Sequence, residues 1–320
     1  MSRSREKDPT ANYFAAVAVL HRMARLDPTL RQRLRLARGL ARMLLPSNAG
    51  QLRYAFEELL GETAASAKRL LYDWFFYRQM EGRSWADGGE RGLLADAHDV
   101  GAYLANCSRG IVVATIHLGD YLEGLRQLRA VTPTGRRVFV VRRKQWSAVE
   151  ERAFARIASD DLALTVLRTG ERAAFVAVRE LRRGAIVVVL FDLPPRFGRD
   201  TGVEFFGRSA RVVCGPAELA VLGRADVMPV FTHYDATGAS CVEAMPVVAA
   251  QFSRYESTAA RNARAAAITQ RLWLLAEQQI RCYPAQWAHW LWIHELIVTS
   301  PRYHGDVSLI SAKSKNVKTQ

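Results

Sequence analysis

A histidine followed by two acids is the feature of this sequence with the clearest chemical potential. His117, Asp120 and Glu123 stand in the stretch His-Leu-Gly-Asp-Tyr-Leu-Glu, directly after the apolar run 111–116. A neutral imidazole can act as a general base, and a nearby carboxylate can fix its tautomer and stabilise the imidazolium. Asp120 and Glu123 are both candidates for that carboxylate. The same spacing also suits a helix start in which Asp120 serves mainly as the N-cap.

The pattern around this stretch predicts an α/β fold. Six apolar runs, most of them rich in β-branched residues, are expected to be strands: 111–116, 137–141, 162–167, 185–190, 227–231 and 241–245. Helical patterns at 122–130, 146–158 and 175–182 separate the first four of these runs. Strands that alternate with helices indicate a central, mostly parallel mixed sheet that is flanked by helices. His117 would then lie at the carboxyl end of the sheet, where ligands of such folds collect.

Helical segments are expected before and after this sheet. The N-terminal part carries apolar residues at helical spacing, with helices before Pro46 and one over about 64–80. The pattern is helical again from about 257 to 298 and is interrupted at Pro284. We therefore predict a basic helical segment, an α/β domain and a flexible tail, with these boundaries: 1–92, 93–300 and 301–320.

The composition indicates a globular protein with an anionic partner. An apolar fraction of 49% with 24% charged residues excludes a disordered or fibrous chain. Lys and Arg number 45 against 31 Asp and Glu, and 39 of the basic residues are arginines, which bind carboxylates and phosphates in a forked geometry. No nucleic-acid-reading motif accompanies the charge, so nucleic acid is not the expected partner. Seven arginines between residues 22 and 42 predict reversible binding to an anionic membrane surface.

Cysteine usage and hydropathy predict a cytoplasmic protein. The four cysteines form no CxxC motif and fit neither a zinc site nor a disulfide framework. No metal-ligand spacing is visible among the seven histidines, so no metal is expected. The apolar run 13–20 is far shorter than the ~20 residues that span a bilayer, and no signal peptide is recognisable. We expect the protein to be free in the cytoplasm or bound at the inner face of the cytoplasmic membrane.

Several short motifs resemble those of the bacterial lipid A biosynthesis acyltransferase family, of the lauroyl and myristoyl type. The stretch after the first strand is similar to the family's His-x-Gly-Asn-Trp-Glu, although the acid falls at Glu123 and not at Leu122. Further segments resemble family motifs in family order: 191–199, 203–208, 214–220, 227–231, 284–287 and 292–294. The resemblance implies the α/β fold of the wider glycerolipid acyltransferase group. Standard members also carry an N-terminal membrane span, which is not recognisable here.

The resemblance implies direct acyl transfer from an acyl carrier protein or coenzyme A thioester to an acceptor hydroxyl, in the standard case that of a lipid A precursor. His117 would be the base, Asp120 or Glu123 would orient it, and no cofactor would be needed besides the thioester donor. The shifted acid leaves other acceptors open: a phospholipid, a glycolipid or a specialised metabolite. It also leaves open a catalytically inactive homologue that binds an acidic partner.

Further side chains are candidates for substrate binding. Arg142 and Arg143 follow the second strand and are expected at the same edge as His117, where they hold an acceptor phosphate or the phosphopantetheine arm, or lie exposed. Phe206 and Gly207 form a wall of an acyl groove or belong to the core. A basic rim, suited to an acidic carrier protein or simply solvated, is expected from four arginines: Arg196, Arg199, Arg208 and Arg211.

Overall fold

The computed structural model describes the central part of the chain in seven stretches: 49–80, 93–94, 97–142, 164–168, 170–236, 238–249 and 256–297. Several predictions lie outside these residues, namely the helices before Pro46, the helix at 146–158 and the tail at 301–320. The division into three parts therefore stays a prediction.

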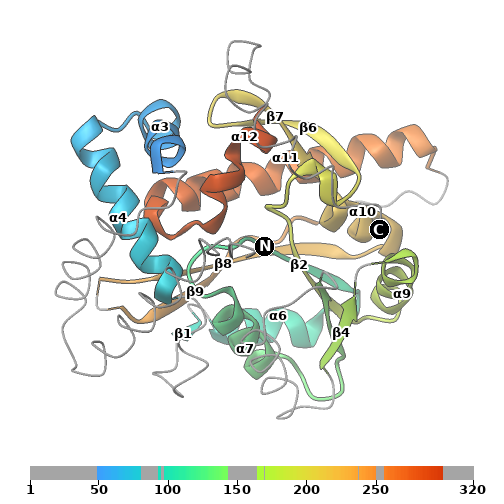
Figure 1. The fold of residues 1–320 in the computed structure, drawn as a ribbon. Helices are drawn as coiled ribbons and strands as arrows, with labels where there is room; N and C mark the ends of the chain where they lie inside the picture. Colours follow the sequence, from blue (N-terminus) through green and yellow to red (C-terminus); the bar gives the residue numbers. More distant parts are fainter. Residues whose placement is uncertain are drawn as a thin grey trace, which may run out of the picture.

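A seven-stranded sheet forms the centre of the molecule, in the order β1-β9-β8-β2-β5-β3-β4 (Figure 1). Its strands have these bounds: β1 (Leu93–Leu94), β2 (Ile111–Thr115), β3 (Val138–Arg142), β4 (Leu164–Arg168), β5 (Ile186–Leu190), β8 (Asp226–Tyr234) and β9 (Ser240–Ala244). Neighbouring strands are parallel except β8 and β9. The predicted mostly parallel mixed sheet is confirmed, and all six predicted strands are present with ends shifted by a few residues.

Helices cover both faces of the sheet. Two helices pack on one face and three on the other, with these bounds: α6 (Ala97–Asn106) and α7 (Tyr121–Val131), against α9 (Glu171–Leu181), α10 (Gly215–Gly223) and α11 (Thr258–Cys282). The strands alternate between the two cores. In β2, Ile111 and Val113 face α6 and α7, whereas Val112 and Ala114 face the other three helices. Burial on both faces explains why this strand is an unbroken apolar run.

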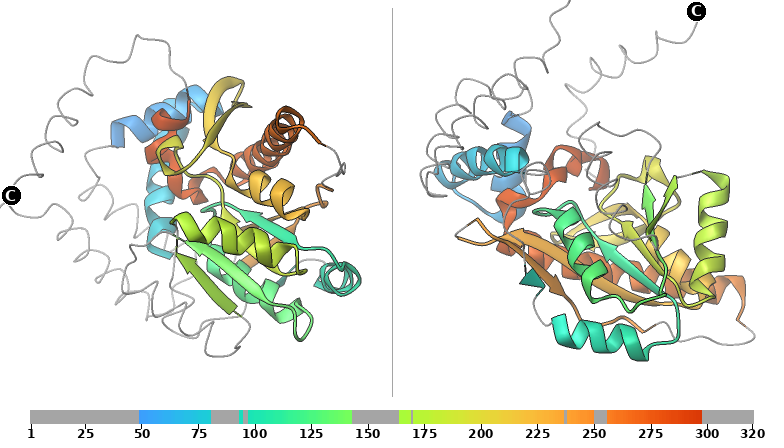
Figure 2. Two further views of the ribbon diagram at one scale, coloured as in Figure 1. Left: turned by 90° about the vertical axis from the view of Figure 1, so that its right-hand side faces the viewer. Right: turned by 90° about the horizontal axis from the view of Figure 1, so that it is seen from below.

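The molecule also has a second sheet of two strands, which the sequence pattern does not predict. β6 (Asp200–Phe205) and β7 (Arg208–Val213) form an antiparallel hairpin that packs against α11 and the short helix α12 (Ile293–Leu296) (Figure 2). Its two-residue turn, Phe206–Gly207, has positive φ angles of 52° and 66°. Such turns match the twist of the paired strands.

The first two helices of the described part pack against the segment after α11, residues 283–297, which we call the C-terminal segment. α3 (Ala49–Leu60) and α4 (Ala64–Met80) contact the 3₁₀ turns η2 (Pro284–Gln286) and η3 (Ala288–Trp292). The Trp74 indole N–H donates to the Trp287 carbonyl at 2.7 Å. The predicted helix at 64–80 and the interruption at Pro284 are confirmed. None of the helices in the described part is long and apolar enough to cross a membrane.

Candidate active site

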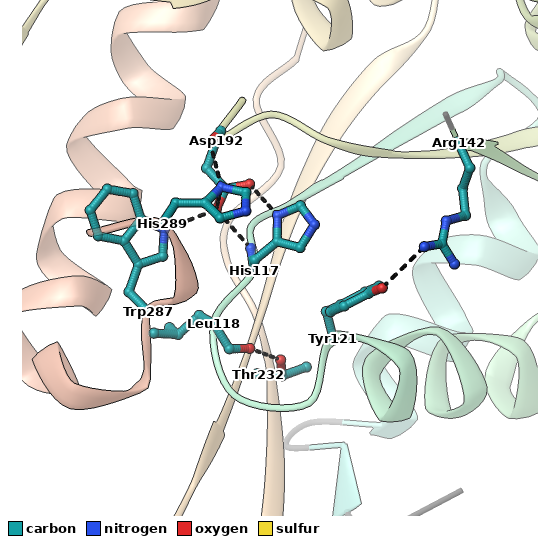
Figure 3. A network of polar contacts seen from close by, with 8 residues as sticks. All are labelled: His117, Leu118, Tyr121, Arg142, Asp192, Thr232, Trp287 and His289. Carbon is teal, nitrogen blue, oxygen red and sulfur yellow. Dashed lines mark hydrogen bonds and ion pairs between the residues drawn. The ribbon is translucent and has the colours of Figure 1, made fainter. Parts of the chain in front are cut away.

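Two neighbouring parallel strands bring His117 and Asp192 together. β2 and β5 pair in register, with Thr115 opposite Leu190, and each functional side chain follows its strand by two residues. Parallel strands end at the same edge of a sheet, so the two loops meet there. His117 Nδ1 lies 2.8 Å from Asp192 Oδ1, and the His117 backbone N–H donates to Asp192 Oδ2 at 2.8 Å (Figure 3).

The C-terminal segment adds two more groups to Asp192. The Trp287 indole N–H donates to Asp192 Oδ2 at 2.9 Å. His289 Nδ1 lies 2.8 Å from the Asp192 backbone carbonyl and 3.2 Å from Oδ2. Both of these atoms are acceptors, so His289 Nδ1 carries the proton and donates. Asp192 therefore holds side chains from two other parts of the chain, the loop after β2 and the C-terminal segment (Figure 3).

Backbone pairing fixes the C-terminal segment against the loop that carries His117. The Ala288 N–H donates to the His117 carbonyl at 2.8 Å, and the Gly119 N–H donates to the Gln286 carbonyl at 3.3 Å. On the other side, the Thr232 hydroxyl of β8 donates to the Leu118 carbonyl. The loop is thus clamped between the sheet and the C-terminal segment, which orients the imidazole.

The surroundings of Asp192 determine the tautomer of His117. Asp192 is completely buried. Burial alone would raise its pKa, but charge interactions and hydrogen bonds with His289 and His117 outweigh burial and hold the pKa well below its usual range. The ionised carboxylate only accepts, so His117 Nδ1 must donate and Nε2 keeps its lone pair. About a fifth of the His117 side chain, 20%, is exposed, so the ring is partly open to solvent.

The same cluster offers three potential metal-ligand atoms. Ligand atoms of His117, Asp192 and His289 lie within 4.8 Å of one another. However, the Asp192 carboxylate already accepts hydrogen bonds from four N–H groups, and a metal ion would have to displace the two that come from the imidazoles. The donor set therefore fits a hydrogen-bonded His-Asp-His unit better than a metal centre.

The two acids that follow His117 in sequence have other partners. Asp120 is completely buried and caps α7, where Oδ1 accepts from the Glu123 backbone N–H at 3.3 Å. The buried Glu123 carboxylate accepts from Arg126 Nε at 2.7 Å and Gln127 Nε2 at 2.7 Å. The structure thus gives Asp120 the N-cap role that was one of its two alternatives.

Asp192 is not among the predicted site residues, although the sequence carries a signal for it. Asp192 follows an apolar β-branched run by the same number of residues as His117 does. What the sequence does not show is that these two strands are neighbours. His289 was also missed, because its place depends on how the C-terminal segment folds back over the sheet.

Arg142 lies close to the cluster. It ends β3, which is a neighbour of β5, and its guanidinium donates to the Tyr121 hydroxyl at 3.4 Å (Figure 3). The Tyr121 ring in turn contacts the His117 ring edge-to-face, with centroids 5.2 Å apart. Arg143 lies outside the described residues.

All four candidate arginines of the basic rim form ion pairs. Arg196 pairs with Glu295 and lies over the Trp292 ring, 5.3 Å from its centroid. Trp292 packs against His289, with ring centroids 4.2 Å apart, so Arg196 is one ring removed from the cluster. Arg199 pairs with Glu218 at 2.6 Å.

The other two rim arginines are paired in the same way, and Phe206 of the hairpin turn is buried. Arg208 pairs with Glu58 at 3.3 Å, and Arg211 forms an ion pair with Asp200. Phe206 is only 6% exposed and packs against Trp290 with ring centroids 5.6 Å apart, which places it in the core. Gly207 is exposed in the turn.

The chain matches the model of a protein family. The family model described as bacterial lipid A biosynthesis acyltransferase matches residues 58–299, about three quarters of the chain. The matched region contains the whole His117–Asp192–His289 cluster. A comparison with curated proteins returned no match.

Proposed function

Because this chain belongs to the bacterial lipid A biosynthesis acyltransferase family, we propose that it moves a fatty acyl group from a carrier-protein or coenzyme A thioester to a hydroxyl of an amphiphilic acceptor. Family membership supports an acyltransferase of the lipid A type. The donor, the acceptor and the roles of individual residues are our proposal. The observation that carries these roles is the bond from His117 Nδ1 to the buried Asp192 carboxylate, which leaves Nε2 free as a base.

In this mechanism His117 acts twice. Its Nε2 takes the proton of the acceptor hydroxyl while the acceptor oxygen attacks the thioester carbonyl. The tetrahedral intermediate then collapses, the carbon–sulfur bond breaks, and the leaving thiolate receives the proton from the His117 imidazolium. Asp192 keeps the imidazole in the Nδ1–H tautomer and balances the charge of the imidazolium. The chemistry uses protein side chains alone, without a metal or a cofactor.

Arg142 is the proposed anion-binding group of the site. Its guanidinium reaches Tyr121, which contacts His117, so a negative group bound there would lie beside the reacting atoms. An acceptor phosphate and the phosphate of a phosphopantetheine arm share that chemistry, because Arg binds phosphate oxygens with two parallel N–H groups. Arg196 and Arg199 remain candidates for contacts to an acidic carrier protein. Their ion pairs with Glu295 and Glu218 would then have to rearrange.

The location is also part of the proposal. An amphiphilic acceptor lies at a membrane surface, and the Arg-rich segment between residues 22 and 42 would attach the protein there by charge. Attachment of this kind is peripheral, and it weakens as salt screens the surface potential. The basic segment lies outside the described residues.

Turnover by His117 variants tests the proposed function. Wild-type protein and His117→Ala would be given acyl carrier protein and coenzyme A thioesters with a lipid A precursor, and in parallel with a phospholipid. Loss of the general base should lower the rate roughly 10²–10⁴-fold. His294→Ala, an exposed histidine in the same C-terminal region as His289, is the control and should keep the rate. A folded His117→Ala protein with full turnover would refute the role of His117, and a wild type without turnover would favour an inactive homologue.

A further inference from the structure

Among the described residues, His289 is the second histidine that bonds to Asp192. We propose that His289 is a positioning residue for the His117–Asp192 pair and that acyl transfer requires His289 in its neutral form. The inference rests on the proposed function, since it concerns the same general base. Beyond the proposed function, His289 acts on the base through Asp192, and His289 itself must be uncharged.

The positioning role follows from where the proton of His289 goes. Nδ1–H points at both the backbone carbonyl and the side-chain Oδ2 of Asp192, at 2.8 and 3.2 Å. One imidazole thus fixes the main chain and the carboxylate of the same residue. The His289 ring is itself held between two others, with centroids 4.1 Å from His117 and 4.2 Å from Trp292. A carboxylate held in this way cannot rotate away when His117 becomes charged.

The condition on charge follows from the distance between the two histidines. During transfer His117 carries the positive charge of the abstracted proton. A protonated His289 would place a second cation with its ring 4.1 Å away, and both would share the single charge of Asp192. Like charges at such a distance repel strongly in a buried site. Protonation of His289 would therefore oppose protonation of His117, which is the step that the base must perform.

The surroundings of His289 favour the neutral form. Burial lowers its pKa; the negative charge of Asp192 opposes this effect, and the charge of His117 adds to it. The charged groups that face it are Asp192, from the loop after β5, and His117, from the loop after β2. Beyond Trp292 lie Arg196 and Glu295, which pair with each other. The lowered pKa leaves His289 neutral at neutral pH, as the proposal requires.

The pH dependence of kcat/KM tests the proposal, with three matched variants. His289→Asn keeps an N–H donor near the place of Nδ1 but cannot be charged. His289→Phe keeps a planar ring without a donor. His294→Asn makes the same change at a nearby histidine that does not take part in the cluster. Each variant would be assayed with the substrates that the wild type uses, over the pH range in which all four proteins stay folded.

The wild type and the three variants are expected to differ in the pH dependence of kcat/KM and in kcat at neutral pH. In the wild type, the logarithm of kcat/KM should fall toward low pH with a slope that rises from about 1 toward about 2, because two protonations inactivate. In His289→Asn the slope should stay at about 1, while His294→Asn follows the wild type. At neutral pH, His289→Phe should lower kcat about 10- to 100-fold with little change in KM, because the buried carboxylate loses a donor. His289→Asn should recover most of that loss.

Different results would overturn the inference and leave the function intact. Equal slopes in the wild type and His289→Asn would refute the condition on charge, and full activity of His289→Phe would refute the positioning role. An NMR titration of the imidazole nitrogens decides the protonation state without any turnover. It should show His289 neutral, with the proton on Nδ1, at pH 7. A His289 that is charged at the pH of highest activity would contradict the proposal, whereas absence of wild-type turnover would count against the proposed function alone.

Discussion

At the scale of single residues, the candidate site depends on a carboxylate that is distant in the sequence. Asp192 lies 75 positions from His117, while the acids that spacing favours, Asp120 and Glu123, serve α7. The place of His117, the proposed base, could be predicted, because a polar residue after a buried strand lies at the edge of the sheet. Its partner could not, because spacing along one chain segment does not tell which strands are neighbours.

The cluster of two histidines and one aspartate should work without a metal ion. Its carboxylate oxygens already accept four N–H groups, so we expect the removal of divalent metals to leave the cluster unchanged. Prolonged dialysis against a strong chelator should leave kcat unchanged, with metal content measured on the same sample. A loss of activity that one divalent metal restores would show that the cluster is a metal centre.

At the scale of elements, the strands that carry the site were predictable and the hairpin was not. β2 and β5 are buried on both faces, so their sequences are continuous apolar runs rich in β-branched residues. Such runs are typical of buried strands. β6 begins with Asp-Thr-Gly, in which Asp and Gly are depleted in strands, and only part of it is buried. Its pairing with β7 depends on the packing of Phe205 and Phe206 with aromatic side chains from the C-terminal region.

The loop between β2 and α7 should not tolerate a side chain at Gly119. Its φ is +55°, and a Cβ would lie 2.7 Å from the Thr232 carbonyl oxygen and 2.7 Å from His233 Cα. Because both are backbone atoms, the loop itself must move, and His117 moves with it. We expect Gly119→Ala to destabilise the fold by more than about 2 kcal/mol and to lower kcat.

Gly135→Ala is the matched control for this loop. Gly135 also has a positive φ, +86°, but no atom lies within 4 Å of an added Cβ. It should cost only the left-handed strain of about 1–2 kcal/mol and leave kcat unchanged. Thermal unfolding and turnover of both variants separate strain from displacement of the loop. Equal losses in the two variants would argue against a loop clamped by β8.

At the scale of the whole molecule, the site depends on contacts between distant parts of the chain. The C-terminal segment, which follows all strands of the sheet in the sequence, supplies Trp287 and His289. α3 and α4 pack against its turns. An apolar pattern predicts that such a segment is buried. It does not predict which edge of the sheet the segment covers, because that depends on the shape of the assembled core.

Stability should decrease as the pH falls below about 6.5. Desolvation lowers the pKa of three histidines among the described residues: the buried His233 and His289, and the exposed His294, whose effect on stability should be the smallest. The unfolded chain, in which histidine has its ordinary pKa, therefore binds protons first as the pH falls. The stabilisation that comes from these neutral histidines is complete above the pKa that histidine has in the unfolded chain. It is lost as the pH falls toward their lowered pKa values in the folded protein.

Urea unfolding at a series of pH values measures this effect. The free energy of unfolding should decline as the pH falls below about 6.5, and the decline should be shallower in His289→Asn. The Asp192 carboxyl should weaken the fold further only at much lower pH, since its pKa lies well below the usual value. A free energy of unfolding that stays constant or rises as the pH falls would contradict the buried, neutral state of His233 and His289.

The most direct test of the account compares two buried aspartates near His117 by the same substitution. Asp192→Asn should place an amide N–H against His117 Nδ1, favour the Nε2–H tautomer and lower kcat about 10²–10⁴-fold in a folded protein. Asp120→Asn keeps a good cap for α7 and should retain near wild-type kcat and stability. A folded Asp192→Asn protein with wild-type turnover, or a folded Asp120→Asn protein that has lost it, would contradict the assignment of Asp192 as the partner of the catalytic base.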